Sequence, residues 1–294
     1  MENDGLAKLK AHSVFVGSDP DLVQASGGNT SWKEDKKVWV KGSGKRLKDA
    51  LTEDVFTFID YESLSKSEIL ACQDFSGLAK NSISPSIEAN FHLALNGEFI
   101  THLHSLGSIA LGISDRNLVE LDFAMDVSFV PYARPGIDLA KAIDRIEDCS
   151  EKILVLRNHG IIVSGQTCSD IESKILEFES LVRSFFTKIP ESESFPSWVQ
   201  ILTSGVLTPD EAVFLGEKPF VESEGVSKGS VAINSKGELI FREDFSNDRV
   251  ELAKFYVRVA KLIGNKTQVN YLDSNEVHQL LGWDKEKKRI AMSK

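Results

Sequence analysis

The chain lacks the features that mark secreted, membrane-spanning or disordered proteins. Its 294 residues include three cysteines, Cys72, Cys149 and Cys168, which are widely spaced and form no CxxC pair. This pattern predicts free thiols that pack as small apolar side chains in a reducing compartment. The longest uncharged stretch, residues 99–114, is interrupted by histidines and serines and is too short and polar to span a bilayer. The first twenty residues hold no apolar core of signal-peptide length, so we expect a cytoplasmic protein.

Basic residues are also in deficit. The chain has 34 Lys and Arg against 44 Asp and Glu, which gives a formal net charge of −10. A nucleic acid is therefore not expected as the main partner, because neutralising phosphates requires clustered basic residues. A small anion held in a local pocket remains compatible with this charge. No low-complexity tract is present, which predicts a folded chain.

The apolar pattern is that of a globular α/β protein, with 41% hydrophobic and 27% charged residues. A helix is expected to begin at Ser84 and Pro85, because serine is a good N-cap and proline suits the first helical position. A longer amphipathic helix is expected over residues 168–188. Strands are expected at residues 37–41, 54–59, 98–104 and 153–156.

The composition shifts at the short polar stretch 188–194, which contains Pro190. We interpret this stretch as a hinge between a main domain, residues 1–190, and a C-terminal extension, residues 191–294. Within the extension, the pattern predicts a hairpin over residues 230–241 with its turn at 235–237, and helices near residues 247–263 and 274–282.

Three of the six histidines are placed where strands are expected to present them together. His102 and His104 are two apart on an expected strand, so both side chains leave the same face. His159 follows another buried strand and precedes Gly160, which suits a tight turn. Three imidazoles at converging strand ends would make an open zinc site. On spacing alone, ordinary polar residues of a half-buried strand remain the competing interpretation.

Glu88 is the candidate acid/base residue. It lies one position beyond the capping-box position of the expected helix, so that local role does not explain it. A carboxylate in a first helical turn also gains from the helix dipole, which is the structural alternative. A carboxylate beside a metal-stabilised enediolate is a natural proton acceptor.

Two glycine-rich loops, residues 26–31 and 41–45, have the composition of an anion-binding site, although neither matches a P-loop or a dinucleotide fingerprint. Glycines expose backbone N–H groups to an anion. Hydroxyl and ammonium donors from the loops and their flanks would add to them, namely Thr30, Ser31, Ser43, Lys33, Lys41 and Lys45. We expect these loops to bind the anionic end of a substrate, and two ordinary turns with solvated lysines are the alternative.

The remaining histidines are interpreted as ordinary residues. His92 follows Glu88 by four positions and is expected to pack beside the site rather than to bind a metal. His12 and His278 lie in polar segments and are expected to be solvated. Trp283 is expected to anchor the C-terminal helix.

In combination, these patterns resemble the class II aldolase/adducin family. In order, the chain reads GGNTS, KGSG, PSIEANFH, THLHS and LRNHG. Members of that family carry G-N-x-S, a Gly-Ser/Thr-Gly loop, a Ser-x-Glu helix, H-x-H and H-G in the same order. The resemblance covers about residues 20–190, and the motifs look closest to the aldolase half of rhamnulose-phosphate aldolase/dehydrogenase proteins. No GxGxxG occurs after residue 160, so we expect no dehydrogenase half here.

The resemblance implies a three-layer α/β/α fold with a largely antiparallel central sheet, to which the extension adds a small α+β part. His102, His104 and His159 would hold a divalent ion, usually Zn²⁺, and Glu88 would be the acid/base residue. The phosphate pocket would be lined by residues of the glycine loops and the glutamate motif, namely Gly28, Asn29, Ser43, Gly44 and Ser86.

The activity implied is that of a metal-dependent aldolase, which cleaves a small sugar phosphate through a metal-bound enediolate. The alternatives are an epimerase, a dehydratase or a decarboxylase on the same metal site, and a non-catalytic adducin-like protein. Ile87 stands where some bacterial relatives carry a second serine, and no clear counterpart exists for their acid tyrosine, with Tyr132 in a segment that looks structural. The resemblance also implies a homo-oligomer, a tetramer, with active sites between subunits.

Overall fold

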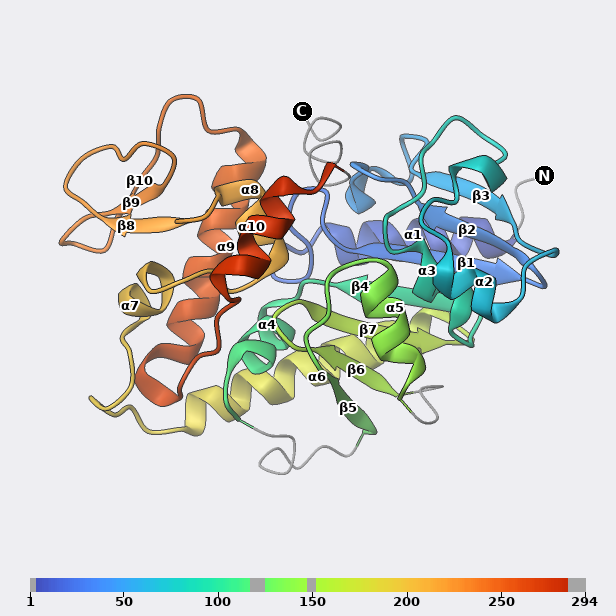
Figure 1. Ribbon diagram of the computed structural model, residues 1–294. Helices are drawn as coiled ribbons and strands as arrows, with labels where there is room; N and C mark the ends of the chain where they lie inside the picture. Colours follow the sequence, from blue (N-terminus) through green and yellow to red (C-terminus); the bar gives the residue numbers. More distant parts are fainter. Residues whose placement is uncertain (1–3, 117–124, 147–151, 285–294) are drawn as a thin grey trace.

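The computed structural model describes residues 4–116, 125–146 and 152–284 (Figure 1). Seven strands form one sheet in the order β3-β2-β1-β4-β7-β6-β5, and every neighbouring pair is antiparallel except β5 and β6. The strands are β1 (Asn29–Glu34), β2 (Lys37–Lys41), β3 (Phe56–Asp60), β4 (Phe99–Leu103), β5 (Val127–Val130), β6 (Ile153–Leu156) and β7 (Gly160–Gly165). The largely antiparallel sheet confirms the predicted fold class.

Helices cover both faces of this sheet (Figure 1). One face carries α1 (Asp4–Gly17), α4 (Leu106–Ile113) and α6 (Cys168–Lys188), and the other carries α2 (Lys66–Ala71), α3 (Ala89–Ala94) and α5 (Ile137–Asp144). Short 3₁₀ turns lie at η1 (Leu47–Asp49) and η2 (Ser76–Leu78). The result is the predicted α/β/α arrangement, in which each sheet face is buried against an apolar helix stripe.

The two sheet faces have separate hydrophobic cores. On one side, Leu9, Ile109 and Phe178 belong to the largest buried cluster. On the other, Phe91 and Leu154 belong to a smaller cluster. The strand at 153–156 is buried on both faces, which is why its sequence is continuously apolar.

The described part of the C-terminal extension, up to residue 284, forms a second, three-stranded sheet and four helices, with elements at the predicted positions of the hairpin and both later helices. Its elements are α7 (Trp198–Thr203), α8 (Pro209–Leu215), β8 (Phe220–Glu222), β9 (Val231–Ile233), β10 (Leu239–Ile240), α9 (Asn247–Ile263), the 3₁₀ turn η4 (Gly264–Lys266) and α10 (Ser274–Gly282). Gly237 has φ +76° in the turn between β9 and β10.

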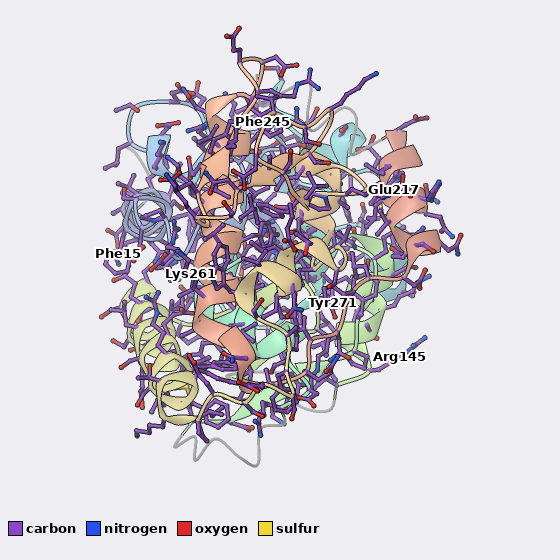
Figure 2. All side chains as sticks on the ribbon, turned by 90° about the vertical axis from the view of Figure 1, so that its left-hand side faces the viewer. Phe15, Arg145, Glu217, Phe245, Lys261 and Tyr271 are labelled. Atoms are coloured by element: carbon purple, nitrogen blue, oxygen red, sulfur yellow. The ribbon has the colours of Figure 1, made fainter. Side chains whose placement is uncertain are left out.

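The extension packs on the main domain through shared apolar side chains. Leu207 and Phe255 lie in the same buried cluster as Ile109 and Phe178. Figure 2 turns the molecule so that the extension faces the viewer, with Lys261 of α9 and Tyr271 at its surface. The division at residue 190 stays a prediction.

The prediction that a helix begins at Ser84 was wrong, because α3 begins at Ala89. The preceding segment is extended: Ser43 N–H donates to the Ser84 carbonyl at 2.8 Å, and Ser86 N–H donates to the Lys41 carbonyl at 3.1 Å. Backbone groups that would start a helix are thus used by the second glycine loop. Proline also disfavours helical geometry in the residue before it, which agrees with an extended Ser84.

Two further expectations concern side-chain exposure and the membrane. His12 is buried at 2% exposure, so the prediction that it is solvated was wrong, whereas His278 is exposed.

Cys72 and Cys168 are free and half-buried, and Cys149 lies outside the described residues. Among the described helices, none combines the length and the apolar character that a membrane crossing requires.

Candidate metal centre

The sheet brings the three candidate histidines to one place. His102 lies near the end of β4 and His104 just after it, so the strand presents both side chains on one face. His159 lies in the tight turn between β6 and β7, next to Asn158, whose φ is +54°. Because β7 pairs with β4, this turn is adjacent to the end of β4.

The three rings converge tightly. One potential ligand nitrogen from each of His102, His104 and His159 lies within 4.8 Å of the others, and all three residues are buried. Nε2 of His102 is 3.0 Å from Nε2 of His104. The Glu88 carboxylate approaches from the start of α3, with one oxygen 3.5 Å from Nε2 of His102 and the other 3.5 Å from Nε2 of His159.

Hydrogen-bond partners fix where the protons of two rings lie. Nδ1 of His102 is 2.9 Å from the Ile161 carbonyl oxygen, and Nδ1 of His104 is 2.9 Å from a carboxylate oxygen of Asp210. Both partners are acceptors, so each Nδ1 carries the proton. A neutral ring then has only a lone pair on Nε2, and two such lone pairs face each other at 3.0 Å. A proton shared between the two rings, or a metal cation, would join them.

Burial sets the charges of the cluster. It lowers the pKa of His102 to about 4 and that of His159 to about 3, although the Glu88 carboxylate acts in the opposite direction. Burial alone would raise the pKa of Glu88, but the neighbouring histidines and the Asn29 amide hold it at about 2. Near neutral pH, His102 and His159 are therefore neutral beside an ionised carboxylate. This is the protonation state in which such groups bind metals.

One buried atom of the cluster supports the same interpretation. Oε1 of Glu88, which faces Nε2 of His159 at 3.5 Å, has no hydrogen-bond partner among the described residues. A buried polar atom without a partner is costly, so each such atom requires an explanation. Three imidazoles with an adjacent carboxylate are a donor set that suits a divalent transition metal, so the residues fit a metal ion.

A chain of hydrogen bonds orients Glu88. Nδ2 of Asn29 donates to the Glu88 carboxylate at 2.9 Å, and Oδ1 of Asn29 accepts from Nε2 of His92. Ser31 Oγ lies 2.7 Å from Nδ1 of His92 and is the remaining donor. Both ring nitrogens of His92 are therefore used in holding Asn29.

The glycine loops lie beside this cluster. Gly28 has φ +59°, and a Cβ there would be 2.8 Å from the His102 carbonyl oxygen, so glycine is required for the close approach. Lys41 is buried, and its ammonium donates to the carbonyls of Ser26 at 2.5 Å and Lys45 at 2.8 Å. The Lys41 side chain thus joins the two loops.

A cavity of about 500 Å³ opens next to the cluster. Its described lining holds four serine hydroxyls and no lysine or arginine. The lining residues are Ser43, Gln73, Asp74, Phe75, Ser76, Ser84, Pro85, Ser86, Ile87 and Asn90. Ser86 Oγ is 3.4 Å from Nδ2 of Asn29, which places the cavity next to the partner of Glu88.

Two candidate substrate residues are not brought to this place. Thr30 alternates with Asn29 along β1 and faces the opposite side of the sheet, where its hydroxyl contacts Ser13 Oγ at 2.7 Å. Lys33 lies toward the far end of β1 and donates to the Leu95 carbonyl. Gly44 has φ +73° and lies in the loop that contains Ser43.

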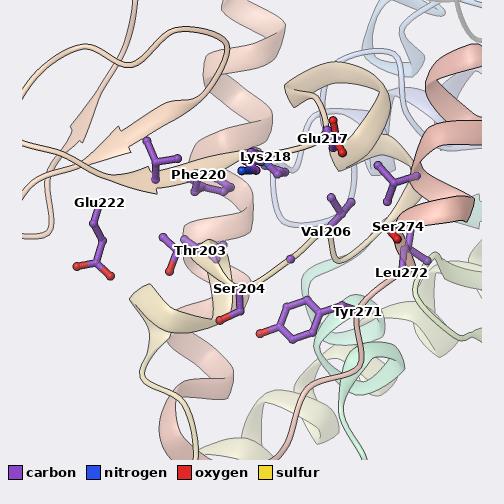
Figure 3. A pocket seen from close by; sticks show the side chains of 15 residues that line it. Thr203, Ser204, Val206, Glu217, Lys218, Phe220, Glu222, Tyr271, Leu272 and Ser274 are labelled. Carbon is purple, nitrogen blue, oxygen red and sulfur yellow. The ribbon is translucent and has the colours of Figure 1, made fainter.

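Sequence reasoning missed Asp210, which contacts His104 although it lies far away in the chain. Its local sequence, Thr-Pro-Asp-Glu, is that of an ordinary helix start and gives no signal of a site. A second cavity of about 520 Å³ lies in the extension, bounded by Phe220 and Tyr271 among others (Figure 3). None of the three histidines lines it.

The fold, the ordered motifs and the histidine cluster agree with the comparison of the whole sequence with known families. The model of the Class II Aldolase and Adducin N-terminal domain matches residues 15–185. This chain belongs to the class II aldolase and adducin family.

Individual relatives differ in their named activities. An L-fuculose phosphate aldolase of Methanococcus vannielii is 27% identical over 173 residues, which cover 54% of this chain and 84% of that protein. A 3-oxo-tetronate 4-phosphate decarboxylase of Haemophilus influenzae is 33% identical over 137 residues, which cover 41% and 64%. The uncharacterized oxidoreductase YuxG of Bacillus subtilis is 25% identical over 193 residues, and the match covers 58% of this chain but 28% of that protein.

Among solved structures, a similar one is the N-terminal class II aldolase domain of a conserved protein from Thermoplasma acidophilum. It has 25% sequence identity and a TM-score of 0.52, and the match covers 63% of this chain and 94% of that one.

Proposed function

We propose that this protein is a divalent-metal-dependent aldolase that cleaves a carbon–carbon bond in a small sugar phosphate. The observation that carries the proposal is the pair of Nε2 atoms of His102 and His104, which face each other at 3.0 Å with Nδ1 protonated in both rings. A shared proton would join that pair, but it would leave Nε2 of His159 and the Glu88 carboxylate, which converge on the same point, without a cation. A metal ion, with Zn²⁺ as the first choice, serves all four groups.

The cation, when bound, stabilises negative charge that develops on the oxygens of a hydroxyketone. Glu88 is the group that moves the proton. In bond formation, its carboxylate takes a proton from the carbon next to the ketone, and in cleavage it returns that proton to the same carbon. The Asn29 amide holds the carboxylate in position at 2.9 Å.

The anionic end of the substrate is assigned to the cavity beside Glu88. Ser43 and Ser86 offer hydroxyl donors there, and Gly28 and Gly44 belong to the loops at its edge. Because the Lys41 ammonium is directed to loop carbonyls, its role in this proposal is to hold the loops, and Lys33 has none. Recognition then rests on hydroxyl and backbone donors rather than on a lysine.

The test is a cleavage screen over ketose phosphates with detection of dihydroxyacetone phosphate, together with metal analysis of the purified protein. We expect about one metal ion per chain and release of dihydroxyacetone phosphate from at least one substrate. Chelation should abolish the activity, and Zn²⁺ should restore it. Less than about 0.2 metal per chain after reconstitution would contradict the proposal, because the arranged donor set predicts tight binding.

A decarboxylase is the second candidate. The described lining of the cavity contains no tyrosine, and the Tyr132 hydroxyl donates to Glu276 at 2.9 Å, so neither provides a tyrosine that would take the hydroxyl proton in cleavage and return it to the aldehyde oxygen in bond formation. Loss of CO₂ requires no such proton transfer. A relative named as a 3-oxo-tetronate 4-phosphate decarboxylase is among those found. Release of CO₂ from a 3-oxo acid phosphate, without dihydroxyacetone phosphate, would favour this candidate.

We further propose a homotetramer, in which a neighbouring subunit completes the site with this acid/base group. Such an assembly would favour the aldolase over the decarboxylase, because a residue of one subunit would then lie at the site of another. Light scattering at micromolar concentration tests it, and a monomer would contradict it.

A further inference from the structure

The second nitrogen of the His104 ring is held by a residue from the C-terminal extension. Oδ2 of Asp210 lies 2.9 Å from Nδ1 of His104, and both residues are buried. Asp210 is in α8, beyond residues 15–185 that match the family. The extension therefore reaches a residue of the candidate metal centre directly.

The backbone around Asp210 is well fixed. The Thr208 side chain caps α8 by accepting the Glu211 N–H, and Pro209 occupies the first helical position. The Glu211 carboxyl in turn accepts the N–H of Leu207. These contacts set the direction in which Asp210 leaves the helix.

A second contact joins the same segment to the turn that carries His159. Nδ2 of Asn158 donates to the carbonyls of Leu207 at 2.9 Å and of Asn270 at 2.8 Å. Asn158 has φ +54°, a conformation that asparagine adopts more readily than most residues. Two of the three candidate ligands are thus held, directly or through a neighbour, by the extension.

The first glycine loop packs against the hydrogen bond between His104 and Asp210. A Cβ at Gly27 would lie 3.3 Å from Nδ1 of His104 and 3.4 Å from Oδ2 of Asp210. A side chain at Gly27 would therefore be in tight contact with both atoms. This packing keeps the pair buried between the main domain and the extension.

The three rings differ in how their second nitrogens are held. His102 donates to a backbone carbonyl, His104 is paired with a carboxylate, and Nδ1 of His159 has no partner among the described residues. A carboxylate is the strongest of these acceptors, because the hydrogen bond is charge-assisted. His104 is the ring whose orientation and basicity depend most on one side chain.

We propose that Asp210 is a positioning residue that fixes the His104 ring with Nε2 facing the metal, so that the C-terminal extension is part of the metal centre. The inference rests on the proposed metal-binding function. A carboxylate that accepts from Nδ1 fixes the tautomer and the rotation of a ligating imidazole and makes Nε2 a better donor. Asp210 itself touches neither the substrate nor the reacting atoms in this role.

The experiment measures Zn²⁺ affinity by competition with a chelating dye for the wild-type protein, Asp210→Asn and Asp210→Ala. Asparagine keeps an acceptor oxygen but loses the charge, and alanine loses both. We expect the Zn²⁺ affinity to fall about 10-fold in Asp210→Asn and toward 100-fold in Asp210→Ala, the range found when such supporting partners are removed. The visible absorption bands of bound Co²⁺ should shift in both variants, because the His104 ring is no longer held in one orientation.

Glu211→Gln is the matched control. It places the same carboxyl-to-amide change at the next residue of the same helix. Glu211 is also buried and makes no contact with the histidines that the structure records, and glutamine keeps an oxygen that accepts the Leu207 N–H. Its Zn²⁺ affinity and Co²⁺ spectrum should equal those of the wild type. An equal loss in the control would assign the effect to disturbance of α8 and would overturn the role of Asp210.

A measurement on the unsubstituted protein remains decisive where Asp210 variants do not fold. Long-range ¹H–¹⁵N spectra of the zinc-loaded protein should show the His104 proton on Nδ1. A proton on Nε2, or unchanged Zn²⁺ affinity in soluble Asp210 variants, would overturn the inference while leaving the metal-binding function intact. A wild-type protein that binds no Zn²⁺ would instead overturn the proposed function.

Discussion

The two faces of strands β1 and β4 carry two buried polar networks, which differ in whether each hydrogen-bond donor meets an acceptor. On one face, Asn29 and His102 point toward Glu88 and the histidine cluster. On the other, Thr30 and Thr101 point toward α1, where His12 lies. The same strands, in the same register, supply both networks.

The α1-side network is closed. Nδ1 of His12 lies 2.9 Å from a Glu172 carboxylate oxygen, and Nε2 lies 2.7 Å from the Thr101 hydroxyl, so one nitrogen donates and the other accepts. Ser13 donates to the Leu9 carbonyl and accepts from Thr30. In the histidine cluster, by contrast, acceptors face acceptors. Buried polarity alone does not mark a site; a mismatch of donors and acceptors does.

Glu88 and Glu211 extend this lesson to carboxyl groups. Both are buried, and in both Oε1 has no partner among the described residues. Burial raises the pKa of Glu211 to about 8, opposed only by two backbone N–H groups, whereas the histidines and Asn29 outweigh burial at Glu88 and hold its pKa at about 2. Glu211 satisfies its environment with a proton, and Glu88 is left as an anion that requires a cation.

Among substitutions that would distinguish the two networks, His102→Ala is expected to have the largest effect on metal binding and activity. Removing one of three converging nitrogens should abolish stoichiometric Zn²⁺ binding and activity. In the metal-free protein, the free energy of unfolding should fall by less than in His12→Ala, because loss of the hydrogen bond to Ile161 is offset by removal of the unfavourable pair of facing lone pairs. Metal analysis and urea unfolding of the metal-free protein measure the two quantities. Retained metal at one ion per chain would contradict the proposed ligand set.

Glu88→Gln should have the next largest effect. The amide has the same shape but cannot accept the substrate proton, so kcat should fall about 100-fold or more. Zn²⁺ binding should persist through the three histidines. Nearly full activity on the substrate found in the screen would show that another group moves the proton.

On the closed face, His12→Ala should show the opposite pattern to His102→Ala. It leaves Thr101 and Glu172 without their ring partner, so the free energy of unfolding should fall by about 1–3 kcal/mol. Zn²⁺ affinity should stay within about twofold of the wild type, since no His12 atom reaches the cluster; urea unfolding and dye competition report the two. If His12→Ala lost Zn²⁺ affinity but not stability, the α1-side network would belong to the site and the comparison of the two faces would be wrong.

An effect on the pH dependence of stability, without loss of metal, is expected for Glu211→Gln. Between its ordinary pKa of 4.5 and the folded value of about 8, the folded protein keeps the Glu211 proton and the unfolded chain loses it. Stability is therefore lost as the pH rises through this window. Glutamine cannot ionise, so stability of the variant relative to the wild type should rise by about 1 kcal/mol or more from pH 5 to pH 8. Urea unfolding at both pH values measures it, and a pH-independent difference would contradict the protonated state.

Regular elements of this fold are predictable from local patterns. The strands at 37–41 and 153–156 and the helices at 168–188, 247–263 and 274–282 have the expected bounds, because their apolar periodicity or continuous burial is written in adjacent residues. The helix expected at Ser84 fails because the competing partners of its backbone, residues 41–43, lie elsewhere in the chain.

The site divides in the same way. The spacing of His102 and His104 shows that they share a face, and the resemblance to the family groups them with His159 and Glu88, which the structure brings together. The burial of His12 and the contact of Asp210 depend on residues far apart in sequence. No local pattern encodes such contacts, so they require the assembled fold.

The turn that carries His159 is held by hydrogen bonds from Asn158 to the carbonyls of Leu207 and Asn270, two residues that are synthesised later. All three histidines are synthesised long before Asp210 and Asn270, and at about 5–20 residues per second the roughly 110 residues after His159 take about 6–22 s. During that interval the turn that carries His159 lacks the partners that fix it. We expect a nascent chain arrested near residue 200 to release Zn²⁺ to a chelator far faster than the full-length chain does. Metal capture would then be the last step of maturation, and a chain whose synthesis stops early would not retain an active ion.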